Sequence, residues 1–282
     1  MEYVTLNNGV KMPLAGFGTY RVESSQTCQE SIAQAVEAGY RLIDTASFYG
    51  NEEYLGTAVK QAGVPREALF ITTKVWFTDF EGEACRASLE KSFQKLGLEY
   101  LDLVLLHWPF GNVYAAWRVL EEYYKAGRIR AIGVSNMDGV GLVDLIRFHS
   151  VVPAVNQIET HLYCQQQETA LWMKKYNVVH QAYAPLGHGM AKEMFAEPLV
   201  QKLAQKYGKT PVQIVLQFLT GQGISVIPKS VHPERIRENI QIFDFTLEAG
   251  EEESLRSLDR DIPLIGKIRD PEKLLDLCGK RS

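Results

Sequence analysis

Four side chains that can donate, accept or hold a proton stand at or just after the ends of short apolar runs in the first half of the chain. They are Asp44, Tyr49, Lys74 and His107. When consecutive buried strands run parallel in a barrel, their carboxyl ends meet at one mouth. We therefore expect the four side chains to form one site, although each alone also has an ordinary explanation, such as a turn hydrogen bond or a solvated loop lysine.

The chemistry that this set offers is protonation of an oxygen atom. A tyrosine phenol has an ordinary pKa of about 10, so Tyr49 is expected to need a lowered pKa to donate a proton near neutral pH. A nearby Lys74 ammonium would lower it, and Asp44 would keep that ammonium charged and oriented. His107 would position a substrate carbonyl oxygen. The set contains no carbon nucleophile and no metal site, so protonating a carbonyl implies a hydride from a nicotinamide cofactor.

Strands and helices alternate along the chain, and this alternation predicts how the four side chains are positioned. The expected strands are 14–18, 42–44, 69–74, 101–107, 129–135, 154–157, 178–183 and 224–229. The expected helices are 25–38, 52–61, 83–96, 114–126, 140–148, 168–176, 198–207, 211–219 and 233–240. Eight apolar strands separated by helices predict an α/β fold of the (β/α)8 TIM barrel type. The alternative is an open doubly wound sheet, but Gly16-Phe17-Gly18-Thr19-Tyr20-Arg21 lacks the last glycine of a dinucleotide fingerprint.

The segments outside this repeat are expected to cover the barrel. Residues 3–12, with a turn at Asn7-Asn8-Gly9, predict a β-hairpin that plugs one end. An extra helix follows strand 7, and a helix over 248–258 with a tail to Ser282 follows the last strand. Because no low-complexity linker divides the sequence, we expect residues 1–282 to form one domain.

Composition limits the classes of function. The 282 residues carry a net charge of −4 without a basic cluster, which argues against general nucleic-acid binding. No apolar stretch approaches the roughly 20 residues of a membrane span, and the first residues show no signal-peptide pattern. The cysteines are scattered at 28, 85, 164 and 278, which predicts reduced thiols rather than disulfides or zinc. We expect a cytoplasmic protein that is a monomer.

Several stretches of the chain resemble the motifs of the aldo-keto reductase family, in particular its short bacterial-type members. They are Gly39–Asn51, Ile71–Trp76, Leu103–Pro109, Ile132–Asn136, Asn156–Glu159, Ala182–Gly187, Ile227–Ser230 and Pro233–Asn239. They occur in order over almost the whole chain. The resemblance implies NADPH-dependent reduction of aldehydes and ketones to alcohols on a TIM barrel. It also implies a catalytic tetrad of Asp44, Tyr49, Lys74 and His107, with Tyr49 as general acid.

The resemblance further implies a set of NADPH contacts. They are Thr19, Asp44, Ser135, Asn136, Gln157, Tyr183, Leu186, Lys229, Ser230, Arg235, Glu238 and Asn239. Tyr183 is expected to stack on the nicotinamide, and Ser135, Asn136 and Gln157 to hold its carboxamide. The phosphate end also follows from the residues alone, because helix N-termini after the last barrel strands suit phosphate. A solvated basic helix is the ordinary alternative there. Ala184 stands where many members have serine, so one phosphate hydroxyl is missing.

Six aromatic residues lie close to the expected strand ends and predict an apolar substrate slot with Tyr49 and His107 as its polar floor. They are Tyr20, Phe48, Trp76, Phe77, Trp108 and Phe110. For Phe77 and Phe110, packing at the rim explains the position nearly as well. None of the six is cationic, and the loop after His107 is short, which predicts broad reduction of uncharged aldehydes, dicarbonyls and activated ketones. The tail from Ile262 to Ser282 is the segment that would close over the slot.

Two other classes of function remain open at this point. One is a cofactor-binding sensor or structural protein on the same scaffold, since a fold does not fix a function. The other is a phosphate-binding lyase or isomerase barrel. The intact set of Asp44, Lys74 and Tyr49 favours a reductase over a sensor, because binding alone has no use for a proton donor. A lyase or isomerase leaves Tyr49 and Tyr183 unexplained.

Overall fold

The computed structural model describes residues 1–265, 268 and 270–279 of the chain. Eight parallel strands form a barrel in the order β10-β9-β8-β7-β6-β5-β4-β3. They are β3 (Gly16–Gly18), β4 (Leu42–Asp44), β5 (Phe70–Val75), β6 (Leu103–Leu106), β7 (Ile132–Ser135), β8 (Val155–Glu159), β9 (Val179–Tyr183) and β10 (Ser225–Val226). The sheet closes where Ala15 and Val226 form a parallel bridge and the Val226 N–H donates to Leu14 O at 2.8 Å. The predicted TIM barrel is confirmed.

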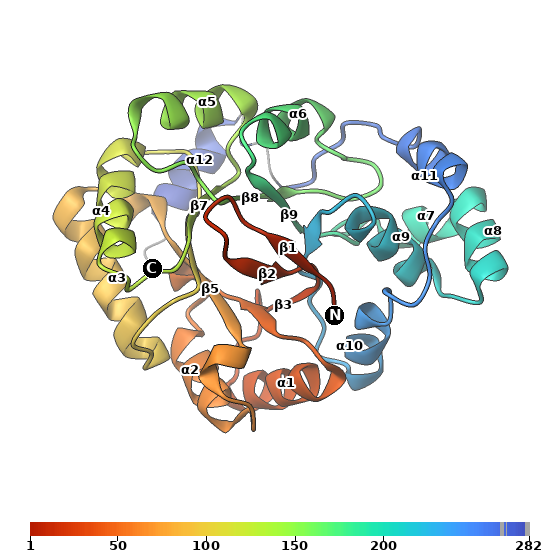
Figure 1. Cartoon of the computed structure of the whole chain (residues 1–282), viewed down its shortest axis with the longest axis horizontal. Coiled ribbons are helices and arrows are strands. Elements are labelled where there is room, and N and C mark those ends of the chain that lie inside the picture. Colours follow the sequence, from red (N-terminus) through yellow and green to blue (C-terminus); the bar gives the residue numbers. More distant parts are fainter. Residues whose placement is uncertain (266–267, 269, 280–282) are drawn as a thin grey trace.

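Helices surround the barrel on its outer side (Figure 1). They are α1 (Ser25–Ala38), α2 (Glu52–Gln61), α3 (Gly82–Leu96), α4 (Val113–Lys125), α5 (Gly139–Phe148), α6 (Gln167–Lys175), α7 (Ala191–Ala196), α8 (Pro198–Tyr207), α9 (Pro211–Thr220), α10 (Pro233–Ile240), α11 (Ala249–Arg256) and α12 (Pro271–Cys278). Three 3-10 turns lie at Ser47–Tyr49, Arg66–Ala68 and Phe77–Asp79. Helix α7 was not among the predicted elements, because six residues are too few to show a helical period.

Local sequence signals set both ends of helix α1, whose bounds match the predicted range 25–38. Helix α1 starts after Ser24, whose side chain accepts a hydrogen bond from the Thr27 N–H, as an N-cap does. It stops at Gly39, which has a φ of 105°. A left-handed residue ends a helix at least cost when it has no Cβ. These caps fix the turn that leads into β4 and hence the position of Asp44.

Alternation along the strands decides which side chains enter the barrel. Phe70 and Leu42 pack with the residues that fill the barrel interior, whereas Ile71 packs with the surrounding helices. Successive side chains of a strand point to opposite faces of the sheet. Lys74, four residues after Phe70, and Asp44, two residues after Leu42, therefore point into the barrel. Both side chains are almost completely buried.

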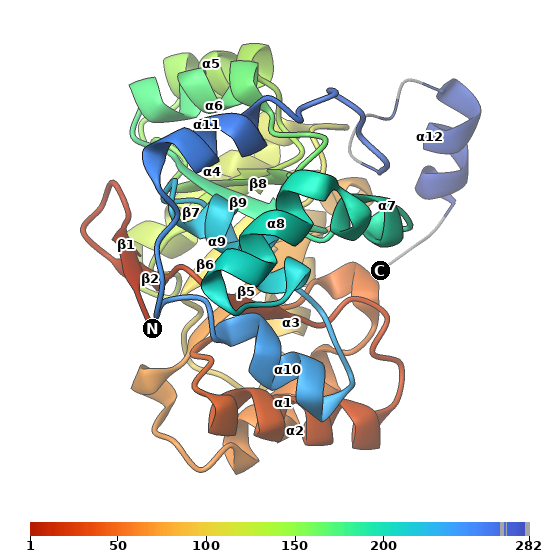
Figure 2. The ribbon, with the colours of Figure 1, turned by 90° about the vertical axis from the view of Figure 1, so that its right-hand side faces the viewer.

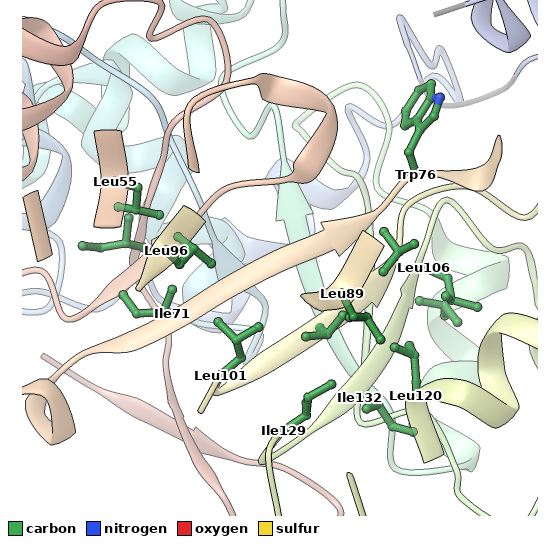
Figure 3. Close-up of a cluster of buried hydrophobic side chains, with 14 of the residues drawn as sticks. Leu55, Ile71, Trp76, Leu89, Leu96, Leu101, Leu106, Leu120, Ile129 and Ile132 are labelled. Carbon is green, nitrogen blue, oxygen red and sulfur yellow. The ribbon is translucent and has the colours of Figure 1, made fainter. Parts of the chain in front are cut away.

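The main core lies between the barrel and helices α1 to α5 (Figure 3). Its labelled members include Leu55 of α2, Leu89 and Leu96 of α3, Leu120 of α4, and Ile71 and Ile132 of the strands. Figure 3 also shows Trp76 just past the carboxyl end of β5, at one end of this cluster. The same apolar layer that holds the helices thus continues to the mouth of the barrel.

An N-terminal hairpin closes the other end of the barrel. Strands β1 (Tyr3–Thr5) and β2 (Lys11–Pro13) pair antiparallel, and Met12 is fully buried in the barrel interior. The Asn7 side chain donates to Pro153 O just before β8 begins. The hairpin crosses the barrel axis in Figure 1. It therefore plugs the amino-terminal end, as predicted, and leaves the carboxyl-terminal end as the mouth.

Some strands are shorter than the apolar runs that predicted them. Of the predicted strand 101–107, residues 103–106 form β6. Before it, Leu101 forms an isolated parallel bridge with Ile129. The run 224–229 narrows to β10, and Pro228 at its end has no N–H for a sheet hydrogen bond. The predicted tail over 262–282 includes α12, while residues 266–267, 269 and 280–282 lie outside the described residues. Within the described ranges, no helix has the length and apolar character to cross a membrane.

The core makes a direct prediction for stability. Leu89 of α3 is fully buried, so Leu89→Ala should lower the free energy of unfolding by about 2–5 kcal/mol through lost burial and a residual cavity. Leu171 of α6 is 70% exposed, so Leu171→Ala should change it by less than about 0.5 kcal/mol. Urea unfolding of the two variants measures the difference. Equal effects would contradict the packing described for α3.

Candidate active site

A buried ion pair lies at the centre of the mouth. The Lys74 Nζ atom lies 2.5 Å from Asp44 Oδ1, and it also donates to Thr45 O at 2.8 Å and to Tyr49 Oη at 3.3 Å. Three acceptors match the three protons of an ammonium group. Burial raises the pKa of Asp44 and lowers that of Lys74, while each charge opposes the shift of its partner. Since a buried ion pair persists only with such hydrogen bonds, the Lys74 ammonium is fixed in one orientation.

A chain of polar side chains continues from this pair through the barrel interior. Gln157 Nε2 donates to Asp44 Oδ2 at 2.8 Å and to Gln181 Oε1 at 2.8 Å. Gln181 Nε2 donates to Ser225 Oγ at 3.2 Å, and Ser225 Oγ donates to Pro13 O of the hairpin at 3.2 Å. Gln181 and Ser225 were not predicted as site residues, because on strands β9 and β10 they read as ordinary core positions. The chain holds the second Asp44 oxygen in place.

Tyr49 lies on the 3-10 turn that follows β4, and its ring is half-buried. Burial raises its pKa well above the ordinary value, and the nearby Asp44, Tyr183 and Tyr20 raise it further. The prediction that Lys74 lowers the pKa of Tyr49 is therefore wrong. Desolvation disfavours the phenolate, and the Asp44 carboxylate beside Lys74 disfavours it as well. Tyr49 is a neutral phenol that carries its proton at neutral pH.

His107 follows β6 and borders the same space. Its backbone N–H donates to Val75 O at 3.0 Å, which extends the strand pairing by one residue. Burial lowers the pKa of His107 well below its ordinary value, and the Lys74 charge adds to this effect. The imidazole is thus neutral and keeps one N–H donor. Its ring centre lies 5.7 Å from that of Tyr49, and the two rings meet edge-on, so both side chains border the same space.

The loops around Asp44 depend on a residue that was not predicted as a site residue. Asn51 is buried, accepts from Thr45 Oγ1 at 2.7 Å, and donates to Thr19 O at 2.9 Å. Thr19 itself donates from Oγ1 to Asp44 O at 2.9 Å. Thr19, predicted as a cofactor contact, therefore uses its hydroxyl on the backbone beside the ion pair. An asparagine just before a helix looks like an N-cap, which is why its role was missed, but its side chain makes no cap bond to α2.

Residues predicted to hold the nicotinamide meet beside His107. Ser135 and Gln157 are register partners on β7 and β8, and Ser135 Oγ donates to Gln157 O at 2.8 Å. Asn136 has a φ of 58°, and its Nδ2 donates to His107 O at 3.0 Å. The Tyr183 hydroxyl donates to Asn136 Oδ1 at 2.6 Å. The structure thus brings four predicted cofactor residues together next to the tetrad.

The residues predicted for the phosphate end lie after β10 and on α10. Ser230 is buried and its Oγ accepts from the His232 N–H at 3.1 Å, while Lys229 and Arg235 are exposed. Burial lowers the pKa of Lys229, Glu23 opposes the shift, and the unpredicted Arg21 adds to it. Of the remaining predicted contacts, Leu186 follows β9 and packs against the buried cluster that includes Ala182 and Met194, and Glu238 and Asn239 lie on α10. This side of the mouth therefore carries neighbouring positive charges.

The predicted aromatic residues form a continuous wall around Tyr49 and His107. Phe48 stacks on Trp76 with ring centres 3.9 Å apart, and Trp76 meets the His107 ring edge-on at 5.1 Å. Tyr20 lies 5.0 Å from the Tyr49 ring. The wall is apolar on the side of β5 and β6.

The outer part of this wall is packed rather than open. Trp108 stacks on Phe110 at 5.9 Å, and Phe77 meets Phe110 edge-on at 5.7 Å. Trp76, Phe77 and Trp108 are all buried, whereas Tyr20 is 43% exposed. Phe77 therefore packs at the rim through Phe110 and Trp76, and its part in a substrate pocket stays a prediction.

Comparison with known proteins agrees with this geometry. The model of the Aldo/keto reductase family matches residues 15–260. The chain belongs to the aldo/keto reductase family. Glyoxal reductase of Bacillus subtilis is 41% identical over 261 residues, which cover 92% of this chain and 94% of that protein. Methylglyoxal reductase of Yersinia pestis is 42% identical over 259 residues, with 91% and 92% covered.

A solved structure shows the same arrangement of the chain. The crystal structure of an aldo-keto reductase from a Medee basin deep-sea metagenome library superposes with a TM-score of 0.91. That protein is 40% identical, and the match covers 94% of this chain and 97% of the other. Membership of the aldo/keto reductase family makes the protein an oxidoreductase and supports carbonyl reduction as its type of reaction.

The ion pair predicts how Lys74→Met changes stability. The variant leaves the Asp44 carboxylate buried without its ammonium, and breaking a buried pair from one side costs about 3–5 kcal/mol. Burial already raises the pKa of Asp44, and loss of Lys74 should raise it further. A carboxyl group with a higher pKa in the folded than in the unfolded chain is stabilised by protonation, so the penalty should shrink as the pH falls.

Urea unfolding of wild type and Lys74→Met at neutral pH and at about pH 4, near the ordinary carboxyl pKa, measures this effect. The double variant Asp44→Asn/Lys74→Met serves as control, because it removes both charges and should recover part of the loss at neutral pH. A loss of stability that does not depend on pH would contradict the ionic pair.

Proposed function

We propose that this protein reduces aldehydes and ketones to alcohols with NADPH as the hydride donor and Tyr49 as the proton donor. The observation that carries the proposal is the Lys74 ammonium, which donates to Tyr49 Oη and is held by Asp44 in the barrel. One carbonyl oxygen of a substrate can accept a hydrogen bond from the neutral Tyr49 phenol and another from the neutral His107 imidazole. The membership of the family and the names of the two relatives support the same type of reaction.

The proton transfer follows from the electrostatics of these side chains. The raised pKa of Tyr49 keeps its proton in place until a stronger acceptor, an oxygen with growing negative charge, comes within reach. The phenolate that then forms is stabilised by the hydrogen bond from Lys74, whose charge Asp44 preserves. Neutral His107 donates a hydrogen bond to the same oxygen and orients it. The tetrad thus stabilises the negative charge that develops on the carbonyl oxygen during the reaction more than it stabilises the neutral carbonyl group of the substrate.

The residues at the mouth suit a nicotinamide cofactor with a phosphate group. A bound reduced nicotinamide would supply the hydride. Both amide protons of Gln157 go to Asp44 and Gln181, so Gln157 would accept from the carboxamide with Oε1. The half-buried ring of Tyr183, fixed through its hydroxyl by Asn136, suits stacking.

The phosphate end of the cofactor is proposed to lie at the positive side of the mouth. Lys229, Ser230 and Arg235 are the residues that would hold the 2′-phosphate, with Arg21 adding positive charge near Lys229. A guanidinium offers planar, charge-assisted hydrogen bonds to phosphate. Glu238 and Asn239, on the same helix as Arg235, are proposed to contact the adenosine, and Leu186 to line the path between the two ends.

Small carbonyl compounds without charge are the proposed substrates. The wall made by Phe48, Trp76 and Trp108 is apolar, and the loop after His107 is short because α4 already begins at Val113. Both relatives named above are reductases of small dicarbonyl compounds. We therefore propose dicarbonyls, aldehydes and activated ketones.

The cellular location and the oligomeric state of the protein stay predictions from the sequence. Cys28 and Cys85 are buried and free, and Cys278 is exposed and free. This state suits a reducing cytoplasm, in which we propose that the protein works as a monomer.

The proton donor is tested by Tyr49→Phe, which removes only the hydroxyl. We expect the turnover to fall by about 100-fold to 10,000-fold, as for loss of a general acid, while the Kd for NADPH stays within about twofold. Tyr3→Phe, on the exposed β1, is the control. The oxidation of NADPH with methylglyoxal and with an aromatic aldehyde is the measurement. Retention of near-wild-type turnover by Tyr49→Phe would refute the mechanism.

The cofactor preference is tested by Arg235→Ala. Loss of a charged hydrogen bond should raise the Kd for NADPH about tenfold or more, with little effect on NADH, which lacks the phosphate. Arg237→Ala is a matched control, because Arg237 is exposed on the same helix two residues further on. Fluorescence titration gives both constants. Equal affinity of the wild type for NADPH and NADH would show the assignment to be wrong.

The substrate class is tested by kcat/KM over a panel of dicarbonyls, aromatic aldehydes, ketones, open-chain sugars and keto acids. We expect dicarbonyls and aromatic aldehydes to be reduced better than sugars and keto acids, because the wall next to Tyr49 is apolar. A strong preference for a charged keto acid would contradict the apolar wall while leaving the reductase assignment intact. A protein that binds NADPH but reduces nothing in the panel would favour the sensor.

A further inference from the structure

Three uncharged side chains connect the closed end of the barrel to the ion pair at its mouth. They are Ser225, Gln181 and Gln157, named here the polar relay, and all three are almost completely buried. Figure 2 shows the hairpin from which the relay starts at one end of the barrel, on the side opposite α12. Because the relay is buried, its donors and acceptors have to be matched inside the barrel. The groups at its two ends therefore decide which way each amide is turned.

The direction of the relay is set first at the hairpin. The Ser225 hydroxyl lies 3.2 Å from Pro13 O, and a backbone carbonyl can only accept. The single proton of Ser225 is used there, so its oxygen is left to accept from Gln181 Nε2 at 3.2 Å. The Met12 sulfur, 4.0 Å from Gln181 Nε2, is a second acceptor on the same side. The nitrogen of the Gln181 amide therefore faces the hairpin, and its oxygen faces Gln157.

The same direction continues to the ion pair. Gln181 Oε1 can only accept, so Gln157 has to turn its NH2 group toward it, at 2.8 Å. The second proton of that NH2 group goes to Asp44 Oδ2, also at 2.8 Å. The Lys74 ammonium donates to the other oxygen, Asp44 Oδ1. Each oxygen of Asp44 therefore faces a donor, and a proton on either oxygen would point at another proton.

Protonation of Asp44 at Oδ2 would require the whole relay to reverse. The new O–H group needs an acceptor, so Gln157 would have to present Oε1 in place of its NH2 group. Gln181 and Ser225 would then have to turn as well, and the Pro13 carbonyl would lose its present donor. A buried acceptor that loses its partner is costly. The hairpin therefore opposes protonation of a carboxylate that lies at the far end of the barrel.

Burial acts on Asp44 in the opposite sense. It raises the pKa of Asp44, whereas the charge of Lys74 and the hydrogen bond from the relay lower it. The other titratable groups that border the pair are the phenols of Tyr49 and Tyr183 and the imidazole of His107. Burial raises the pKa of both phenols and lowers that of the imidazole, so all three are neutral. The charge of Asp44 therefore depends on Lys74 and on the relay.

We infer that Gln181 is a positioning residue of a relay that the hairpin carbonyl turns in one direction, and that this relay keeps Asp44 a carboxylate and thereby keeps Lys74 an ammonium. The effect on the reaction rests on the proposed reductase function, in which the ammonium stabilises the phenolate of Tyr49. The effect on the protonation of Asp44 rests on the hydrogen bonds alone.

Two variants break the relay without changing a hydrogen-bond partner of Asp44. Gln181→Met keeps the length of the side chain and removes its acceptor and its donors. Ser225→Ala removes the hydroxyl that fixes the direction of Gln181 and leaves both glutamines in place. Gln217→Met is the matched control. Gln217 is also a buried glutamine, but it lies on α9 and donates to Phe245 O at 2.7 Å, away from the relay.

The protonation of Asp44 is measured by carbon-13 NMR of the protein labelled at the aspartate carboxyl carbons, with the Asp44 signal assigned by its loss in Asp44→Asn. We expect the proton affinity of Asp44 to rise about threefold to tenfold in both relay variants, as for the loss of one hydrogen bond. Gln217→Met should titrate like wild type. This readout needs no turnover, so it separates failure of the relay from failure of the proposed function.

The pH dependence of stability is a second readout that loss of packing alone would not change. Breaking the relay destabilises the carboxylate form of Asp44 and spares the protonated form. The loss of unfolding free energy in Gln181→Met should therefore be largest at neutral pH and shrink as the pH falls through the raised pKa of the folded state. The loss in Gln217→Met should not depend on pH. Urea unfolding at neutral pH and at about pH 4 measures both.

The effect on the reaction is measured as the single-turnover rate of NADPH oxidation with methylglyoxal at saturating cofactor. An ammonium that gives part of its proton to Asp44 stabilises the phenolate less. We expect the rate to fall about threefold to tenfold in Gln181→Met and in Ser225→Ala, and to stay within about twofold in Gln217→Met. The double variant should show no more than the larger single effect, because both changes break the same relay.

Each other outcome overturns part of the inference. An Asp44 signal that titrates alike in wild type and both relay variants would overturn the control of its charge by the relay. The same holds if the signal stays that of a carboxylate in all three proteins wherever they are folded. A shifted titration with an unchanged single-turnover rate would overturn the link to the Lys74 ammonium. If Gln181→Met fails to fold, Ser225→Ala decides both questions.

Discussion

The site depends on one interaction, the contact between the Lys74 ammonium and the Asp44 carboxylate inside a barrel that excludes water from both. Removing two charges from water is costly, and only full hydrogen bonding makes the pair tolerable. Thr45 O and Tyr49 Oη complete the coordination of Lys74, and Gln157 binds the second oxygen of Asp44. The need to satisfy these charges is what fixes the position of the tyrosine hydroxyl, and with it the geometry of the proposed proton donor.

The same burial sets the resting state of the two neighbours of the pair. Desolvation raises the pKa of Tyr49 and lowers that of His107, so that both are neutral although a charged lysine lies beside them. Before the reaction, Tyr49 and His107 carry no charge and the Lys74 ammonium is paired with Asp44. The site is therefore arranged to stabilise a charge that forms during the reaction. The apolar stack of Phe48 and Trp76 contributes by keeping the surroundings of His107 dry. The low polarity of the barrel mouth therefore sets both the hydrogen bonding that the ion pair needs and the neutral state of Tyr49 and His107.

The two ends of the barrel support the site in different ways. At the closed end, the hairpin carries Pro13, whose carbonyl begins the hydrogen-bonded chain through Ser225, Gln181 and Gln157 to the ion pair. At the open end, Glu159 ties the tail to the rim. The first support is internal and involves side chains that water does not reach, whereas the second holds a segment at the surface.

The sequence by itself determined the elements and the inward set of residues. Short apolar runs that alternate with helical segments, a helix stop such as Gly39, and polar residues at the ends of the runs are local signals. They were enough to predict the barrel and to place Asp44, Lys74 and His107 together. Only the tertiary structure decided the pKa of Tyr49, because desolvation and the neutralisation of Lys74 depend on distances across the barrel. It also decided the roles of Gln181 and Glu159, whose partners lie 24 and 105 residues away along the chain. A sequence shows which groups can form hydrogen bonds, and the folded chain determines which of them are close enough to do so.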